Sequence, residues 1–133
     1  MNPNRVVLDT NVLVSALMSS LGNPAIIFKM FLSETIVLVY SEDIMLEYND
    51  VMYRPHLHIP SDDADKVLDA IRLYGERVDP TPSTIPMIDE DDRVFYDTAK
   101  SAGACLVTGN ARHYPSESFI YSPAEYLKSW TKL

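Results

Sequence analysis

The stretch Arg5-Val6-Val7-Leu8-Asp9-Thr10-Asn11-Val12-Leu13-Val14-Ser15-Ala16 decides the fold of this chain. Its first apolar run, residues 6–8, is short and aliphatic, which predicts a strand buried on both faces. The run meets Asp9, whose charge cannot stay unpaired in an apolar interior, and the residues after Asn11 fit a helix. Asp9 therefore stands at the carboxyl end of the strand, where open α/β sheets bind ligands. The stretch alone leaves two interpretations equal: a functional carboxylate, or a cap on the next helix.

The composition limits which classes of protein this chain can belong to. The 133 residues fit one domain spanning 1–133, and a formal net charge of -8 argues against binding nucleic acid through bulk positive charge. The negative charge is compatible with an enzyme that binds RNA through a few local contacts. It could also attract a basic segment of a partner protein. The single cysteine, Cys105, excludes an internal disulfide and is expected to be a small buried hydrophobe. The sequence shows no signal-peptide pattern and no membrane span, which predicts a cytoplasmic protein without membrane contact.

Strands and helices are predicted to alternate along the chain. Apolar runs predict further strands at 36–40, 104–107 and 119–121, with a short edge strand at 76–79. Helical periodicity and capping residues predict helices at 12–19, 24–31, 41–54, 60–75, 89–101 and 123–130. This alternation implies βαβ units with right-handed crossovers. The expected fold class is α/β, a three-layer α/β/α sandwich with a mainly parallel central sheet.

Four polar residues fall where the carboxyl edge of such a sheet would gather them. Asp9 ends the first strand, Glu47 lies in the helix after the second, Asp92 opens the helix before the third central strand, and Asn110 follows that strand. Clustered carboxylates repel one another unless protons or cations neutralise them. Oxygen ligands suit Mg²⁺ or Mn²⁺, which activate water for attack on a phosphodiester. Taken singly, each residue is explained by a helix cap, a solvated helix face or a turn. The functional interpretation is supported only if all four side chains lie close together in the fold.

Several motifs occur in order along nearly the whole chain. They are Val7-Leu8-Asp9-Thr10-Asn11-Val12 with Ser15-Ala16, Ser41 with Glu47, Asp89 and Asp91-Asp92 with Phe95 and Ala99, Leu106-Val107-Thr108-Gly109-Asn110, and Ser122-Pro123-Ala124-Glu125-Tyr126-Leu127. In this order and spacing they resemble the PIN-domain family of metal-dependent ribonucleases. Within that family the sequence is similar to the VapC-like branch of toxins of toxin-antitoxin systems.

The resemblance implies an endoribonuclease that hydrolyses RNA phosphodiester bonds with Mg²⁺ or Mn²⁺. It assigns the catalytic, metal-binding carboxylates to Asp9, Glu47 and Asp92, with Asn110 as a further ligand. Many family members have an aspartate at the position of Asn110, and asparagine can ligate a cation but brings no charge. Thr10, Asn11 and Thr108 are expected to orient carboxylates or waters. Asp97 is expected to be an outer acid, or to replace the missing charge. The cations expected nearest to bound RNA are Arg54, Arg93 and Arg112.

The resemblance also implies partners. An antitoxin would insert a basic side chain into the acidic cleft, and the chain would form a homo-oligomer, a dimer or a tetramer. Two alternatives to the nuclease stay open. A catalytically weak or inactive PIN-fold module that binds RNA or protein is favoured by Asn110 and the acidic surface. A phosphatase with Asp9 as its nucleophile needs a second acid two residues later, where Asn11 stands.

Overall fold

The computed structural model describes residues 2–131. Its strands are β1 (Asn2–Leu8), β2 (Val37–Tyr40), β3 (Glu76–Arg77), β4 (Ala104–Val107) and β5 (Ile120–Tyr121). Its α-helices are α1 (Thr10–Met18), α2 (Asn23–Leu32), α3 (Glu42–Met52), α4 (Ser61–Tyr74), α5 (Arg93–Ala102) and α6 (Pro123–Thr131). Short 3-10 helices are η1 (Pro55–Leu57), η2 (Glu90–Asp92) and η3 (Ala111–His113).

The five strands form one parallel sheet in the order β3-β2-β1-β4-β5. β1 lies at the centre, where Val6 pairs with Leu38 of β2 on one side and with Cys105 of β4 on the other. Val6 and Val7 are fully buried, as predicted for a strand covered on both faces. Because all strands run the same way, their carboxyl ends meet at one edge, which is the edge that Asp9 reaches.

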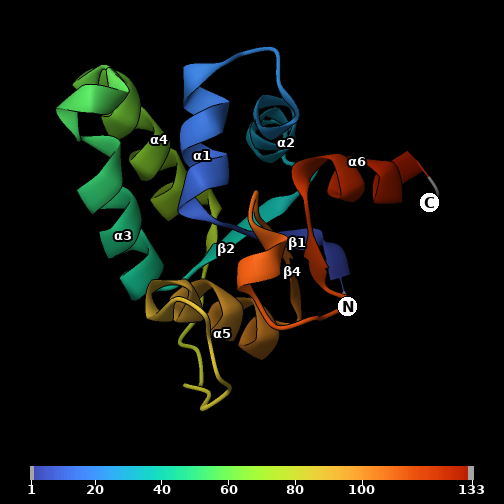
Figure 1. Cartoon of the computed structure of the whole chain (residues 1–133). Helices are drawn as coiled ribbons and strands as arrows, with labels where there is room; N and C mark the ends of the chain where they lie inside the picture. Colours follow the sequence, from blue (N-terminus) through green and yellow to red (C-terminus); the bar gives the residue numbers. More distant parts are fainter. Residues whose placement is uncertain (1, 132–133) are drawn as a thin grey trace.

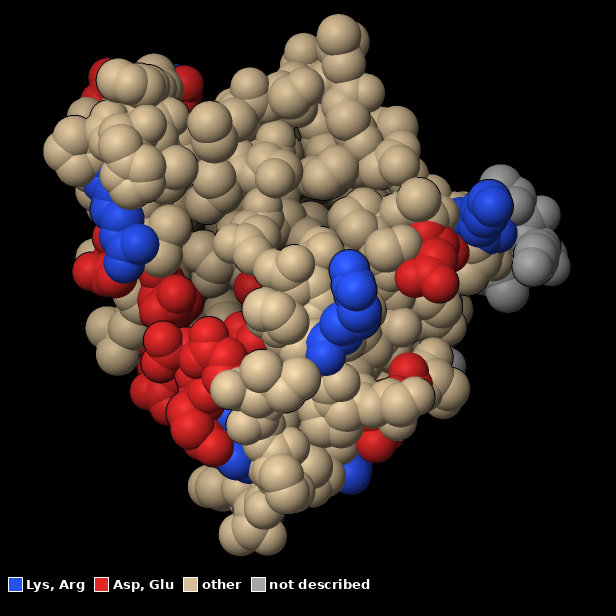
Figure 2. All heavy atoms as spheres, viewed as in Figure 1, with Lys and Arg blue, Asp and Glu red and all other residues tan. Residues whose placement is uncertain are grey.

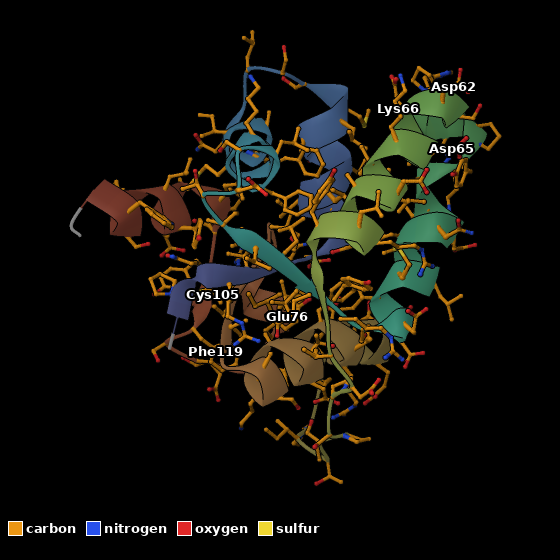
Figure 3. The ribbon with its side chains drawn as sticks, turned by 180° about the vertical axis from the view of Figure 1, so that it is seen from behind. Asp62, Asp65, Lys66, Glu76, Cys105 and Phe119 are labelled. Carbon is orange, nitrogen blue, oxygen red and sulfur yellow. The ribbon has the colours of Figure 1, made fainter. Side chains whose placement is uncertain are left out.

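Helices cover both faces of the sheet (Figure 1). α5 packs against β1, β2 and β4 on one face, while α1, α2 and α6 lie on the opposite side. α4 packs against β2 and β3, and α3 contacts α1, α4 and α5 at the end of the sheet. Figure 3 shows the layers from behind, with Lys66 of α4 far from Cys105 of β4. The predicted three-layer sandwich is confirmed, and the sheet is parallel throughout the described chain.

The start of α5 differs from the prediction. The sequence predicts that residues 89–92 open the helix, but they form the 3-10 turn η2, and α5 begins at Arg93. The Asp89 side chain accepts a hydrogen bond from the Asp91 backbone N–H at 3.0 Å. Aspartate side chains compete in this way with helical hydrogen bonds, which is why they favour turns and caps over helix interiors. Asp92 is therefore the last residue before α5.

Helix caps follow the sequence in some places and depart from it in others. Ser41 caps α3 through a hydrogen bond from the Ile44 N–H, as predicted. Ser122 and Glu125 form the predicted capping box, in which each side chain accepts the backbone N–H of the other. At α4 the sequence offers Ser61 and Asp62 as capping side chains, but the residue in the cap position is Pro60.

In the part of the chain that the structure describes, no single helix has the length and apolar composition needed to cross a membrane. α1 and α2 meet the requirement only as a pair, and the two helices are bent by 94° relative to each other.

Candidate functional site

Asp9 lies at the junction between β1 and α1. Its backbone N–H donates to the Val107 carbonyl at 3.0 Å, which extends the parallel pairing, and its own carbonyl accepts from the Val12 N–H. The residue occupies the cap position of α1, yet its side chain makes no capping hydrogen bond. The carboxylate oxygen Oδ2 instead accepts from Thr108 Oγ1 at 2.7 Å and from the Tyr114 hydroxyl at 3.1 Å. The capping interpretation of this carboxylate is therefore wrong.

Thr108 holds Asp9 in place from the end of β4. Its hydroxyl donates to Asp9 and accepts from the Asn110 backbone N–H at 3.0 Å, so both capacities of the hydroxyl are used. Thr108 is fully buried, and its own N–H donates to the Tyr121 carbonyl. The ends of β1, β4 and β5 are thereby tied together around one carboxylate.

Two tyrosines complete the surroundings of Asp9, and the sequence analysis did not assign them this role. Tyr114 donates to Asp9 itself, and Tyr48 of α3 donates its hydroxyl to the carbonyl of Leu8, the preceding residue. Burial and the charge of Asp9 raise the pKa of both hydroxyls far above the ordinary value, so both stay protonated donors. Tyr114 is 105 residues from Asp9 in the sequence, and no local pattern could have linked the two.

Asp92 lies close enough to Asp9 for their charges to interact. Burial is the main cause that raises the pKa of Asp92 to about 6, and the charges of Asp9 and Asp89 raise it further. His113 opposes this effect, with its Nδ1 at 4.0 Å from Asp92 Oδ2. The Asp92 side chain retains 18% of its exposure, so it is accessible from solvent. A carboxylate with these properties favours either a proton or a cation beside it.

Glu47 of α3 also interacts with the charge of Asp9. Partial burial raises its pKa, and the charges of Asp50, Asp91 and Asp9 raise it further, while Arg54 lowers it. Figure 2 shows acidic side chains gathered on this face, where α3 and the start of α5 lie side by side. The structure thus brings Asp9, Glu47 and Asp92 to one edge of the sheet, from three different segments.

The smaller polar residues predicted for the site lie around that edge. Asn110 is exposed and precedes η3, and Asn11 is exposed in the first turn of α1. Thr10 is buried beside Asp9, and its hydroxyl Oγ1 has no hydrogen-bond partner. Buried polar atoms without a partner are rare, and each one needs an explanation such as a bound water or ion.

Two predicted residues serve another segment. Asp97 Oδ2 accepts from the Ser83 N–H at 3.1 Å, and Arg93 donates to the carbonyls of Ser83 and Ile85 and to Glu90. Both side chains therefore stabilise the irregular connection that precedes η2, and neither makes a hydrogen bond to Asp9. Asp97 also leaves its buried Oδ1 without a partner.

The two other predicted cations lie on the surface. Arg54 is exposed and pairs with Asp50 at 2.7 Å, the surface pairing expected of a solvent-exposed arginine. Arg112 is exposed on η3, beside Asn110, and has no hydrogen bond or ion pair with a described residue.

The carboxylate and hydroxyl oxygens at this edge are of the type that binds a divalent cation, but they do not surround a common point. Among the described residues, no three His, Cys, Asp or Glu side chains converge tightly enough to hold a metal ion. The raised pKa values of Glu47 and Asp92 and the unpartnered Thr10 hydroxyl nevertheless fit a site that a cation completes. Mg²⁺ keeps several waters and commonly uses only one or two carboxylates. The residues present therefore fit a water-rich Mg²⁺ or Mn²⁺ site with Asp9 and Asp92 as its nearest carboxylates.

Comparisons with known proteins cover the same region. A family model described as PIN domain matches residues 5–112. An uncharacterized protein from Methanocaldococcus jannaschii is 28% identical over 109 residues, which span 80% of this chain and 70% of that protein. No solved structure matches the chain at a significant level. The range matched by the family model includes all four residues of the sheet edge, from Asp9 to Asn110.

Proposed function

The chain belongs to the PIN domain family, whose members are generally nucleases, and on that premise we propose that it is a metal-dependent endoribonuclease. The proposed reaction is hydrolysis of RNA phosphodiester bonds with Mg²⁺ or Mn²⁺. One observation carries the proposal: a buried carboxylate, Asp9, is held at the sheet edge, and its charge raises the pKa of both Asp92 and Glu47. Such repulsion is relieved when a divalent cation binds among the three.

Each residue has a distinct task in this proposal. Thr108 and Tyr114 hold the Asp9 carboxylate in one orientation, and Asp92 faces it from the start of α5. Glu47 adds a third negative charge from α3. A divalent ion bound by these carboxylates would supply an activated water and stabilise the charge on the phosphoryl oxygens. Thr108 and Tyr114 fix the direction of the Asp9 carboxylate, which is the contribution expected of supporting hydrogen bonds around a metal.

We further propose that the chain is the toxin of a toxin-antitoxin pair and acts in the cytoplasm. The acidic face in Figure 2 and the net charge of -8 would attract an antitoxin with a basic segment. Exposed apolar side chains, including Met18 and Leu21, support a homo-oligomer, a dimer or a tetramer.

A second candidate function is a binding module with little or no catalytic activity. Asn110 supports it, because an amide at this position removes one negative charge from the edge of the sheet. The lack of three converging metal ligands among the described side chains supports it as well.

Cleavage of a mixed RNA pool by the purified protein tests the proposal. We expect cutting in Mg²⁺ or Mn²⁺, none in EDTA, and none by Asp9→Asn. The matched control is Asp69→Asn, an exposed acid on α4, which should cut as the unmodified protein does. A folded protein that cuts under no condition would refute the nuclease and favour the binding module. A gain of cutting by Asn110→Asp would then identify the missing charge as the cause.

A further inference from the structure

A pocket of about 370 Å³ lies beside the acidic edge and has no role in the site described above. Its volume is at the lower end of the range for small-ligand pockets, roughly 300–1,000 Å³. Tyr114 belongs to both places, because it lines the pocket and its hydroxyl donates to Asp9. A ligand in this pocket would therefore lie next to the proposed point of RNA cleavage. The residues lining the pocket that determine which ligand it could bind are Arg112, Tyr114, Ser116, Glu117, Ile120 and Glu125.

Two carboxylates of the pocket are each held by one oxygen. Glu117 Oε1 accepts from the Tyr96 hydroxyl at 3.2 Å, and Glu125 Oε1 accepts from the Ser122 N–H at 2.9 Å. The hydrogen bonds from Ser122 also lower the pKa of Glu125, so it stays ionised near neutral pH. A carboxylate has acceptor capacity beyond one hydrogen bond. The pocket thus presents two oriented acceptors for N–H groups.

Arg112 gives the pocket a cation that is not committed elsewhere. Its guanidinium has no hydrogen bond or ion pair with a described residue, whereas Arg54 and Arg93 are both paired with acids. Arginine binds phosphate through a planar set of donors and commonly contacts nucleic-acid backbones.

We infer that this pocket binds one nucleotide of the RNA next to the cleaved bond and selects a base that carries an exocyclic amino group. The inference rests on the proposed nuclease function and deepens it. Arg112 contacts a phosphodiester, while Glu117 and Glu125 accept hydrogen bonds from the base. Carboxylates pair in this way with the amino group of cytosine, and adenine offers the same kind of donor. Uracil carries a carbonyl at the corresponding position, so the pocket disfavours it. Such reading of a base requires single-stranded RNA.

Binding of short labelled oligonucleotides to the Asp9→Asn variant tests the inference without cleavage. Fluorescence anisotropy should show cytidine and adenosine oligonucleotides binding at least about fivefold more tightly than uridine oligonucleotides, the lower end of what one good base contact supplies. Adding Glu117→Gln should abolish that ratio, because the amide offers an N–H donor to the uracil carbonyl. Adding Arg112→Ala should weaken all three oligonucleotides alike. The control Lys66→Ala removes a positive charge from α4 and should change neither result. Figure 3 shows Lys66 far from Phe119, the residue that precedes Ile120 of the pocket.

The outcomes separate this inference from the nuclease proposal. Equal binding of the three oligonucleotides, or a ratio that Glu117→Gln leaves unchanged, overturns the base preference even if the unmodified protein cuts RNA. A preference that depends on Glu117 supports the pocket even if no RNA is cut, in which case only the nuclease proposal fails. If both hold, sequencing of the cleavage sites should show amino-bearing bases enriched next to the cut, and Glu117→Gln should remove the enrichment.

Discussion

The Asp9 carboxylate retains only 6% of its exposure, and a charge buried to this extent needs compensating hydrogen bonds. Thr108 and Tyr114 supply them, and a hydrogen bond to a charged group contributes about 1.5–3 kcal/mol. The same two bonds fix the direction of the carboxylate. At the scale of the residue, one arrangement therefore serves both the stability of the fold and the proposed binding of a cation.

Tyr114→Phe should weaken metal-dependent cleavage while the protein stays folded. The change removes one donor to Asp9 but keeps the ring, and loss of a hydrogen bond behind a metal ligand typically costs about 10–100-fold in affinity or activity. Cleavage rates measured against Mn²⁺ concentration should show a higher concentration needed for half of the maximal rate. Tyr121→Phe is the matched control, since that ring packs on Tyr126 and its hydroxyl makes no hydrogen bond to Asp9. Identical curves for Tyr114→Phe and the unmodified protein would show that the bond to Asp9 has no role in activity.

Asp92→Asn should stabilise the metal-free protein at neutral pH. Asp92 has a folded-state pKa of about 6, raised from 3.8, so its ionised form is penalised in the fold. The penalty is fully present above about pH 6 and disappears as the pH falls towards the unfolded value. Because the side chain is partly exposed, we expect only about 1 kcal/mol. Urea unfolding should find the variant more stable at pH 7 and equal to the unmodified protein near pH 4. A variant less stable at pH 7 would mean that the ionised carboxylate makes a net favourable contact.

At the scale of the element, local patterns predicted nearly every strand and helix. Residues 6–8 show the apolar run of a doubly covered strand, and Ser122 with Glu125 shows a reciprocal cap within four residues. These signals are local, because each depends on neighbours in the sequence. The alternation of strands and helices predicted a mainly parallel sheet, whereas the position of β1 between β2 and β4 comes from the structure.

Contacts between distant segments could not be predicted in this way. The tie from Tyr114 to Asp9 and the fastening of Ser83 by Asp97 both depend on how loops fold over the sheet. Asp97 is predicted from the sequence to be an outer acid of the site or a replacement for the charge missing at Asn110. Its hydrogen bond to Ser83 shows that it serves the connection before η2. The carboxylates and the orienting Thr108 could be named from sequence, but the tyrosines Tyr114 and Tyr48 could not.

Gly75→Ala should destabilise the fold through the junction between α4 and β2. A Cβ at Gly75 would lie 2.5 Å from the Ile71 carbonyl oxygen and 2.8 Å from the Leu38 carbonyl oxygen, so backbone must move. Overpacking of this kind costs about 1–3 kcal/mol. The control is Gly22→Ala, whose Cβ would meet Pro24 at an ordinary 3.5 Å. Urea unfolding that gives the two variants equal stability would show that the junction adapts without cost.

At the scale of the whole molecule, the surface divides into an acidic face and apolar positions elsewhere. Met18 and Leu21, with exposed fractions of 58% and 91%, lie where α1 leads into α2. Exposed apolar side chains close together often mark a protein interface. Met18 ends α1 and Leu21 lies in the loop between α1 and α2. This part of the molecule lies on the opposite side of the sheet from α5, so contact between two copies through it would leave the acidic face open (Figure 1).

The double variant Met18→Glu with Leu21→Glu should sediment as a monomer, whereas the unmodified protein should sediment as a dimer or a tetramer. Both side chains are exposed in the single chain, so the change should leave the free energy of unfolding of an isolated chain within about 0.5 kcal/mol. Analytical ultracentrifugation over a range of concentrations measures the difference. The matched control is Leu73→Glu, an exposed position on α4. An unmodified protein that is monomeric at all concentrations would remove the case for this interface.

We propose that Asp9, Glu47 and Asp92, which come from three separate segments, act as one cation site. Titration with Mn²⁺, followed by calorimetry, tests it most directly and does not depend on knowing the RNA substrate. We expect the unmodified protein to bind Mn²⁺, and Asp9→Asn, Glu47→Gln and Asp92→Asn each to weaken binding by about 10-fold or more. Asp69→Asn on α4 should bind as the unmodified protein does. A folded protein that does not bind Mn²⁺, or three site variants that bind it as tightly as the control does, would show that these carboxylates do not form a cation site.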